Sequence, residues 1–325
     1  MKIAFFELDK DEKDLVKKKL KNHKLLFFDN ELTKRTAKKI KDVDAITIFI
    51  YSEITKEILN LLPNLKLIAT MSTGLDHIDL QECKKRKIKV MNVPVYGENT
   101  VAEHTFGLIL ALSKKICDAH DKTRRNDFSL KNLEGFDLKG KTIGIIGVGH
   151  IGSHVAKIAH GFEMKILGVS KDKDRRLERK FGLKFTTLPT LLKKSDIVTI
   201  HCPLLKQTHH LINKRNIKQF KKGSILINTA RGPIVETSAI LYGLKAGILA
   251  GAGLDVLEEE DFIKEEKQLL SKKISKEFDL KIVLSNHMLI NQKNVIVTPH
   301  SAFYTKEALQ RITETTINNI KKFKR

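Results

Sequence analysis

Short apolar runs alternate with charged, helix-patterned stretches from one end of the chain to the other. The runs are rich in Ile, Leu, Val and Phe, which is typical of strands buried on both faces of a parallel sheet. The predicted strands of the first part are Lys2–Phe6, Leu25–Phe28, Ala45–Ile50, Leu67–Thr70 and Lys89–Asn92. The predicted helices between them are Asp11–Lys21, Thr33–Ile40, Ile54–Leu61 and Leu80–Lys87. This order predicts a parallel sheet with helices on its faces.

The alternation restarts in the second part of the chain. Apolar residues at helical spacing, among them Ala102, Phe106, Ile109 and Leu112, predict one long helix over Asn99–Ala119. A polar connector, Lys122–Lys141, follows it. The next predicted strands are Thr142–Gly147, Lys165–Val169, Ile197–His201, Ser224–Asn228, Ala250–Leu254 and Val295–Thr298. With 325 residues, the pattern predicts an α/β chain of two doubly wound parallel-sheet domains.

Two stretches near the end are less clear. The charged stretch Glu265–Asn294 has no assigned role, and the predicted helix Thr305–Lys322 fits either domain.

The chain is strongly basic, with 60 Lys and Arg against 38 Asp and Glu and a net charge of +22. The lysines are spread along the whole chain, without a basic tail or a basic stripe interleaved with aromatic residues. We therefore favour solvated basic faces over nucleic-acid binding, and expect no nucleic-acid partner. A positive field would also attract small anionic substrates.

The sequence also argues against membrane insertion, disulfides and metal binding. Its apolar runs are far shorter than the roughly 20 residues of a membrane span, and Glu7 interrupts any signal-peptide core. The three cysteines, Cys83, Cys117 and Cys202, form no CxxC pair, and the histidines lack ligand spacing. We expect a cytoplasmic protein without a metal site.

A glycine-rich turn is the strongest local signal. Gly147, Gly149 and Gly152 form a G-x-G-x-x-G pattern between a predicted strand and the predicted helix Ser153–His160. The first glycine allows a tight turn, the second a close approach of the backbone to a pyrophosphate, and the third close packing of helix on strand. The pattern favours a dinucleotide site over a glycine-rich turn without a ligand.

The end of the next strand bears on the choice of coenzyme. Ser170 and Lys171 stand where a carboxylate usually holds the ribose hydroxyls, and further cations follow at Arg175 and Arg176. A missing carboxylate favours use of NADP(H), whereas an Asp172 that reaches back would favour NAD(H).

Three later segments, each after a predicted strand, carry Arg231, the pair Asp255 and Glu260, and His300. The carboxyl ends of parallel strands are where open α/β sheets bind ligands, so these groups could converge beside the coenzyme. The alternatives are a structural ion pair for Arg231, a solvated glutamate run and a helix-capping histidine.

With these segments, the chain resembles the D-isomer-specific 2-hydroxyacid dehydrogenase family over nearly its whole length. The matching segments are Ser72–Asp79, Asn92–Tyr96, Val101–His104, the glycine-rich turn and the three segments above. Pro299–Thr305, Val95-Tyr96 and Glu260-Asp261 are most similar to the D-lactate dehydrogenase branch. Ser170 departs from the usual Asp of that branch, and Glu265–Asn294 matches no family motif.

The resemblance implies a coenzyme domain, residues 99–300, inserted into a flavodoxin-like substrate domain of residues 1–98 and 301–325. It implies Arg231, Glu260 and His300 as catalytic residues, and a cleft between the domains. The implied substrate-binding residues are Thr73, Gly74, Tyr96 and Arg231. The implied coenzyme-binding residues are Val101, Gly147, Gly149, His150, Ile151, Gly152, Ser170, Lys171, His201, Cys202, Pro203, Thr208, Thr229, Ala230 and Asp255. Asp255 resembles the residue that contacts the nicotinamide carboxamide, and Asn99–Ala119 with the following segment resembles a dimerisation region, so a homodimer is expected.

The chemistry of these side chains fits those roles. Arg231 can bind a carboxylate and polarise the neighbouring carbonyl, His300 can donate a proton, and Glu260 can stabilise the charged imidazole. We predict NAD(P)H-dependent reduction of a small 2-oxo acid to a D-2-hydroxy acid, with pyruvate and D-lactate favoured. The alternatives are a hydroxypyruvate or glyoxylate reductase, and a non-catalytic NAD(H)-sensing binding protein. Nucleic-acid binding would instead show as salt-sensitive retention on DNA.

Overall fold

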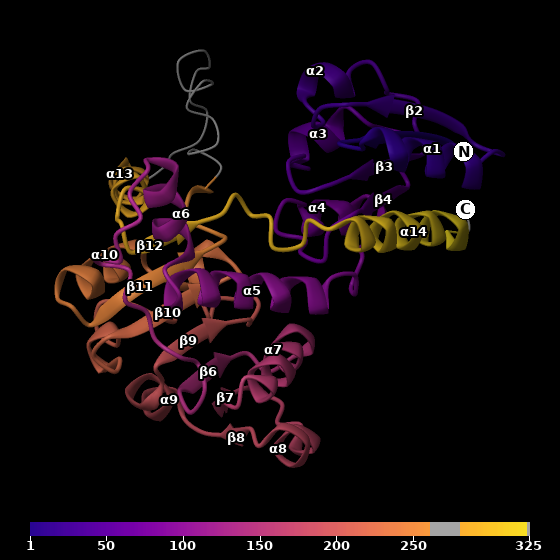
Figure 1. Ribbon diagram of the computed structural model, residues 1–325. Helices are drawn as coiled ribbons and strands as arrows, with labels where there is room; N and C mark the ends of the chain where they lie inside the picture. Colours follow the sequence, from indigo (N-terminus) through magenta and orange to yellow (C-terminus); the bar gives the residue numbers. More distant parts are fainter. Residues whose placement is uncertain (261–279, 324–325) are drawn as a thin grey trace. The chain divides into compact units, whose positions relative to one another are not determined.

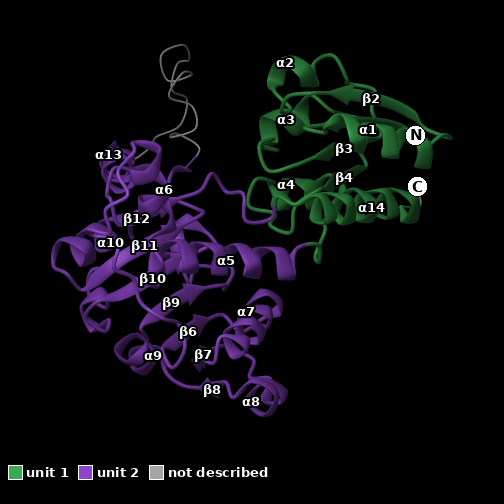
Figure 2. Ribbon diagram, in the orientation of Figure 1, with its two compact units in different colours: residues 1–96, 304–325 green, residues 97–303 purple. Residues whose placement is uncertain are grey.

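The computed structural model describes residues 1–260 and 280–323, and the chain divides into two compact units. Unit 1 contains Met1–Tyr96 and Tyr304–Arg325, and unit 2 contains Gly97–Phe303 (Figure 2). Unit 2 is thus inserted, in chain order, between the two parts of unit 1. Of the charged stretch Glu265–Asn294, residues 265–279 lie outside the described residues.

Unit 1 is built on a parallel sheet. Its elements are β1 Lys2–Phe6, α1 Lys10–Lys19, β2 Lys24–Phe28, α2 Lys34–Ala37, β3 Ala45–Ile48, α3 Lys56–Asn60, β4 Leu67–Thr70, α4 Leu80–Lys85, β5 Lys89–Met91 and α14 Lys306–Lys322 (Figure 1). Among the described residues the strand order is β2-β1-β3-β4-β5, with all pairs parallel. This is the flavodoxin-like order of a doubly wound sheet.

The last helix, α14, belongs to unit 1. The side chain of Thr313 donates to Glu12 of α1 (2.9 Å), and Asn319 donates to the carbonyl of Asn92 (2.8 Å). Its buried face includes Ala308, Ile312 and Ile317. Contacts with residues far away in sequence therefore settle where this helix packs, which its own apolar pattern could not.

Unit 2 carries the second sheet. Its elements are α5 Glu98–Ser113, α6 Ile116–Arg124, β6 Thr142–Ile146, α7 His150–Gly161, β7 Lys165–Val169, α8 Arg175–Phe181, β8 Lys184–Phe185, α9 Leu188–Lys194, β9 Ile197–Ile200, η1 Ile217–Gln219, β10 Ser224–Asn228, η2 Gly232–Ile234, α10 Thr237–Lys245, β11 Leu249–Leu254, α13 Leu280–Ile290 and β12 Val295–Val297. Within the described ranges the strands run β12-β11-β10-β9-β6-β7-β8, all parallel. The predicted fold class, two doubly wound parallel-sheet domains, is confirmed.

The prediction of one helix over Asn99–Ala119 is wrong. α5 ends at Ser113, Lys115 is left-handed (φ 54°), and α6 starts at Ile116. The carbonyl oxygen of Ser113 accepts a hydrogen bond from the backbone N–H of Phe136 (2.9 Å) in the connector. Gly135 makes this approach possible, because a Cβ there would lie 2.1 Å from that oxygen. The connector thus occupies the acceptor that a continued helix would need.

The sheet of unit 2 is buried on both faces. Alternate residues of one strand enter different cores: Ile197 packs with α5 and α7, whereas Val198 packs with α9 and α10. Such two-sided burial explains the continuous apolar runs of the sequence. Figure 1 shows α5 and α7 beside each other along one side of the strands.

Candidate active site

Six strands of unit 2 end at the same edge of the sheet. Ile146 pairs with Val169 and Ile200, and Asn228 pairs with Ile200 and Leu254. Leu254 pairs in turn with Val297. The first residues after these strands therefore line one edge: Gly147, Ser170, His201, Thr229, Asp255 and Thr298. Most of the predicted coenzyme-binding and catalytic residues stand at or just after these strand ends.

The glycine-rich turn after β6 packs too closely for side chains. Gly147 has φ +93°, and a Cβ on it would lie 2.5 Å from the backbone nitrogen of Cys202. A Cβ on Gly152 would lie 2.2 Å from the carbonyl oxygen of Gly147. A Cβ on Gly149, in contrast, would meet no atom within 4 Å.

The space at Gly149 faces the start of α7, whose first residue is His150 and whose first turn has no side-chain cap. Uncapped N–H groups at a helix N-terminus are suited to a phosphate. The strand order also reverses around β6 and β9, which is the switch point where doubly wound sheets bind ligands. The residues present therefore fit a dinucleotide.

The residues after β9 lie against this turn. Nε2 of His201 is 2.8 Å from the side-chain oxygen of Thr199, and burial lowers the pKa of His201 to about 3. Burial also raises the pKa of the Cys202 thiol to about 11. Both groups are neutral near pH 7, so neither is suited to be the proton donor or a thiolate nucleophile.

The loop after β7 and the first turn of α8 carry the cations expected near a ribose. Arg176 is engaged by Asp174, with Nε and Nη2 at 3.0 and 2.9 Å from the two carboxylate oxygens. The hydrogen bond from Arg176 is the largest cause that lowers the pKa of Asp174. Lys171 is exposed and Ser170 half-buried.

His300 and Glu260 form the central polar pair of unit 2. Nδ1 of His300 lies 2.7 Å from Oε1 of Glu260, and the other carboxylate oxygen of Glu260 accepts from the backbone N–H of Leu257 (3.2 Å). His300 adopts a left-handed conformation (φ 54°) and caps no helix, because Thr305 is the N-cap of α14. An imidazole with Nδ1 bound to a carboxylate has Nε2 available for a reacting atom.

Asp255 fixes the backbone that carries His300. Its side chain is 1 % exposed and accepts hydrogen bonds from the backbone N–H groups of Ser301 and Ala302, both at 2.9 Å. It also accepts from the hydroxyl of Thr298 (2.5 Å). The N–H of His300 donates to the carbonyl of Asp255 (2.9 Å). These bonds compensate the strained φ of His300. A contact of Asp255 with the nicotinamide carboxamide stays a prediction.

Arg231 follows β10 in a turn that Asn228 closes. The side chain of Asn228 accepts from the N–H of Ala230 and donates to the carbonyl of Arg231, both at 3.0 Å. The guanidinium of Arg231 donates to the carbonyl of Ala230 (2.8 Å). The side chain of Thr229 meets that of Thr105 of α5 at 3.0 Å. The sequence predicted Asn228 only as the last residue of a strand. An asparagine at that place is the signal that could have indicated its role in closing the turn.

The remaining predicted residues of unit 2 lie in α5, at the start of α7 and in the loop after β9. Val101 is buried in α5, and Ile151 is half-buried in the first turn of α7. Thr208 organises the loop after β9: its hydroxyl donates to the carbonyl of Pro203 (2.6 Å) and accepts from the N–H of Leu205 (2.7 Å).

The predicted substrate-binding residues outside unit 2 belong to unit 1. The hydroxyl of Thr73 donates to the carbonyl of Val93 (2.8 Å), and the carbonyl of Gly74 accepts from Ser72 (2.7 Å). The carbonyl of Tyr96 accepts from Arg311 (2.6 Å). Their role toward a substrate stays a prediction.

Glu258 is a buried residue whose role the sequence did not reveal. It was grouped with Glu259 and Glu260 as an acidic run that could be solvated, yet it is only 5 % exposed. Its carboxylate contacts His210 (2.6 Å) and the backbone N–H of Thr237 (2.6 Å). No periodic pattern distinguishes it from its neighbours.

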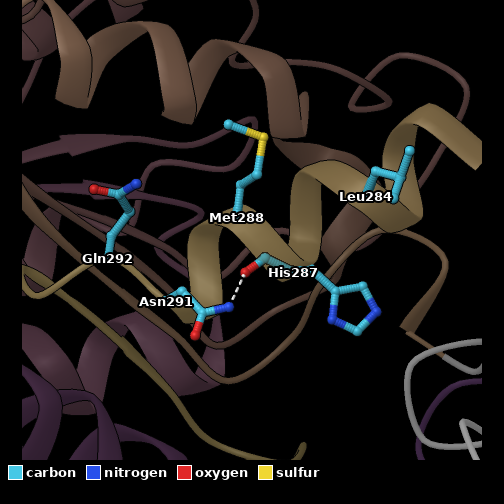
Figure 3. A pocket seen from close by; sticks show the side chains of 5 residues that line it. All are labelled: Leu284, His287, Met288, Asn291 and Gln292. Carbon is cyan, nitrogen blue, oxygen red and sulfur yellow. Dashed lines mark hydrogen bonds between the residues drawn. The ribbon is translucent and has the colours of Figure 1, made fainter.

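Other candidate sites are sparse. Across residues 1–260 and 280–323, no cluster of His, Cys, Asp and Glu could hold a metal ion. No helix in those ranges has the length and apolar character needed to cross a membrane. A surface hollow on α13 and the turn after it is lined by Leu284, His287, Met288, Asn291 and Gln292 (Figure 3). None of these is a predicted site residue.

Known proteins resemble this chain over most of its length. Residues 106–302 match the family description "D-isomer specific 2-hydroxyacid dehydrogenase, NAD binding domain". A 2-hydroxyacid dehydrogenase homolog of Zymomonas mobilis is 38 % identical over 98 % of this chain and 96 % of its own. A glyoxylate reductase of Thermofilum pendens is 41 % identical over 86 % of this chain and 78 % of its own.

A solved structure is also similar to this chain. D-lactate dehydrogenase from Aquifex aeolicus, complexed with NAD and lactic acid, superposes with a TM-score of 0.88 at 37 % identity, covering 98 % of this chain and 94 % of that one. The chain belongs to the D-isomer-specific 2-hydroxyacid dehydrogenase family of oxidoreductases, with the NAD-binding domain in unit 2.

Proposed function

We propose that the protein reduces a small 2-oxo acid to a D-2-hydroxy acid with NAD(P)H, with pyruvate as the favoured substrate. The observation that carries the proposal is the His300–Glu260 pair, 2.7 Å apart, held by Asp255 at the sheet edge that also carries Arg231. A proton donor, a carboxylate that orients it and a fixed cation are the groups that reduction of a 2-oxo acid requires.

Each side chain has a separate role in the proposed reaction. Arg231 binds the substrate carboxylate and polarises the neighbouring carbonyl. His300, with Nδ1 held by Glu260, donates a proton from Nε2 to the carbonyl oxygen. Glu260 favours the charged imidazole and fixes its orientation. A bound nicotinamide coenzyme supplies the hydride.

The coenzyme would be held by the predicted coenzyme-binding residues of unit 2, above all Gly147, Gly149, Gly152 and the start of α7. The absence of a carboxylate at Ser170 and the exposed Lys171 support tolerance of NADP(H) in addition to NAD(H). Arg176 is paired with Asp174, whereas Lys171 directly follows Ser170 and is exposed, so Lys171 is the cation we propose for a 2′-phosphate.

Thr73, Gly74 and Tyr96 are the proposed substrate contacts of unit 1. The lactic acid in the Aquifex aeolicus complex supports pyruvate and D-lactate as the substrate pair. A glyoxylate or hydroxypyruvate reductase is the second candidate, favoured by the Thermofilum pendens relative.

The proposal includes a cytoplasmic homodimer formed through α5, α6 and the following segment. Its support is the exposure of large apolar side chains there: Ile116 (53 %), Phe128 (78 %) and Leu130 (84 %). Such exposure is typical of surfaces that a partner covers. Light scattering at several protein concentrations tests this part.

The decisive experiment compares initial rates of NADH and NADPH oxidation with pyruvate, longer 2-oxo acids, hydroxypyruvate and glyoxylate. Fastest turnover of pyruvate supports the main proposal, and preference for glyoxylate or hydroxypyruvate the second candidate. Coenzyme binding without turnover of any 2-oxo acid would reject both and point to an NAD(H)-sensing protein.

A further inference from the structure

A buried carboxylate lies two residues before Glu260. Oε1 of Glu258 is 2.6 Å from Nε2 of His210, and Oε2 accepts the backbone N–H of Thr237 (2.6 Å) at the start of α10. The carbonyl of Glu258 accepts from Asn286 of α13 (2.6 Å). Asn286 is fully buried. Three segments distant in sequence therefore converge on this one residue.

His210 links Glu258 to the segment of Arg231. The backbone N–H of His210 donates to the carbonyl of Pro233 (2.8 Å), and its own carbonyl accepts from Asn213 (2.9 Å). These bonds hold His210 in a left-handed conformation (φ 48°). His210 thus connects the two turns, by its backbone to the turn after Arg231 and by its imidazole to Glu258.

The two turns also touch directly. A Cβ on Gly232 would lie 2.0 Å from the carbonyl oxygen of Leu257 and 2.5 Å from the backbone nitrogen of Glu258. A small displacement of Glu258 would therefore press on the residue next to Arg231. It would also move Glu260, whose carboxylate is bound by the N–H of Leu257 (3.2 Å).

The turn needs such anchors because its backbone is strained. Glu259, between Glu258 and Glu260, is left-handed with φ 50°. A non-glycine residue in that region is strained and persists only where its surroundings hold it there. The hydrogen bonds of buried Glu258 hold the backbone on one side of Glu259. The contact of Glu260 with His300 holds it on the other side.

We propose that His210 and Glu258 form a positioning pair. This pair holds Glu260 against His300 and fixes the position of Arg231 relative to both residues. The inference rests on the proposed function, because it gives His300 and Arg231 their chemical roles. His210 is the donor that compensates the buried carboxylate. The further titratable groups near it are Glu236 and His209, whose ring is tilted against that of His210.

The test uses three variants of the full chain. His210→Asn keeps the backbone, since Asn tolerates the left-handed region, but its amide is too short to reach Glu258. His210→Gln places an amide nitrogen close to the position of Nε2 and serves as the rescue. His209→Asn removes the neighbouring exposed imidazole and serves as the control.

Two readouts separate positioning from mere stability. The first is the split between kcat, KM and the dissociation constant of NADH. The second is the NMR signal of the proton on Nδ1 of His300, which lies in the contact with Glu260 and is assigned by its loss in His300→Gln. We expect His210→Asn to lower kcat by about 10²-fold, as for an ångström-scale misplacement of a catalytic group, with little change in NADH binding. The Nδ1 proton signal of His300 should move upfield, because the hydrogen bond to the displaced carboxylate of Glu260 is weakened.

The outcomes are distinct. Recovery of kcat and of the Nδ1 proton signal in His210→Gln, with His209→Asn unaltered, supports the positioning pair. A lower melting temperature in His210→Asn with wild-type kcat and a wild-type Nδ1 proton signal overturns it. If the wild-type protein turns over no 2-oxo acid, the proposed function fails, and the Nδ1 proton signal of His300 by itself decides whether the pair positions Glu260.

Discussion

Gly232 and Leu257 approach so closely that any Cβ on Gly232 would lie 2.0 Å from the carbonyl oxygen of Leu257. Gly232→Ala must therefore move backbone, since neither neighbour is a flexible side chain. We expect a loss of about 1–3 kcal/mol in the free energy of unfolding, the usual cost of overpacking. A large fall in turnover should accompany it, because Arg231 is the adjacent residue. Urea denaturation and initial rates measure both.

Gly161→Ala is the matched control. Gly161 ends α7, and a Cβ there meets no atom within 4 Å. This substitution should raise stability by up to about 1 kcal/mol through helix propensity and leave turnover unaltered. Wild-type stability and rate in Gly232→Ala would contradict the close contact.

Asp255→Asn tests the support of the His300 loop. An amide can accept only one of the two backbone N–H bonds from Ser301 and Ala302, so one buried donor loses its acceptor. We expect a destabilisation of about 1–3 kcal/mol and a fall in kcat on the order of 10²-fold. Thermal unfolding and steady-state kinetics measure these effects.

Asp196→Asn distinguishes a site effect from a general loss of stability. Asp196 accepts the backbone N–H of Thr142 (2.8 Å), at the opposite end of β6 from the glycine-rich turn. The substitution Asp196→Asn should lower the free energy of unfolding and leave kcat unchanged. If Asp255→Asn behaves in the same way, Asp255 supports the fold rather than His300.

His300→Ala tests the proton donor. Turnover should fall by about 10²–10⁴-fold, the usual worth of a positioned general acid, while NADH binding stays near wild type. NADH fluorescence titration and initial rates measure the two quantities. Unchanged turnover would reject His300 as the acid, and loss of NADH binding would show a wider structural role.

Ser170→Asp tests coenzyme choice. At an effective dielectric constant of about 20, two charges ~4 Å apart interact by about 4 kcal/mol, so a carboxylate there should strongly oppose a 2′-phosphate. We expect the ratio of kcat/KM for NADPH to that for NADH to fall at least about tenfold. Ser170→Asn, similar in size but uncharged, is the control. Equal NADPH-to-NADH ratios of kcat/KM in the wild type and both variants would show that residue 170 does not contact the 2′-phosphate.

The cysteines should differ in reactivity. Burial raises the pKa of the thiols of Cys83 and Cys202 to about 11, whereas Cys117 is exposed. Since the thiolate is the reactive form, a thiol reagent at pH 8 should modify Cys117 quickly and both Cys83 and Cys202 slowly. Cys117→Ser should remove the fast phase. A fast phase that survives in Cys117→Ser would indicate that another thiol is accessible.

The pattern of apolar runs was enough to predict two parallel sheets, because strands buried on both faces leave continuous apolar segments. The spacing of Gly147, Gly149 and Gly152 predicted the tight turn before α7, because only glycine permits the backbone approaches at Gly147 and Gly152. These are local properties of the chain, determined by periodicity and turn chemistry.

Only the tertiary structure decided which members of a run are buried and what they touch. Glu258 and Glu260 are alike in sequence, yet one is bound by His210 and the other by His300. The break between α5 and α6 depends on Phe136, which lies far from Ser113 in sequence. The reason is physical: periodicity reports which side of an element faces the core, whereas partners from other elements depend on how the elements pack.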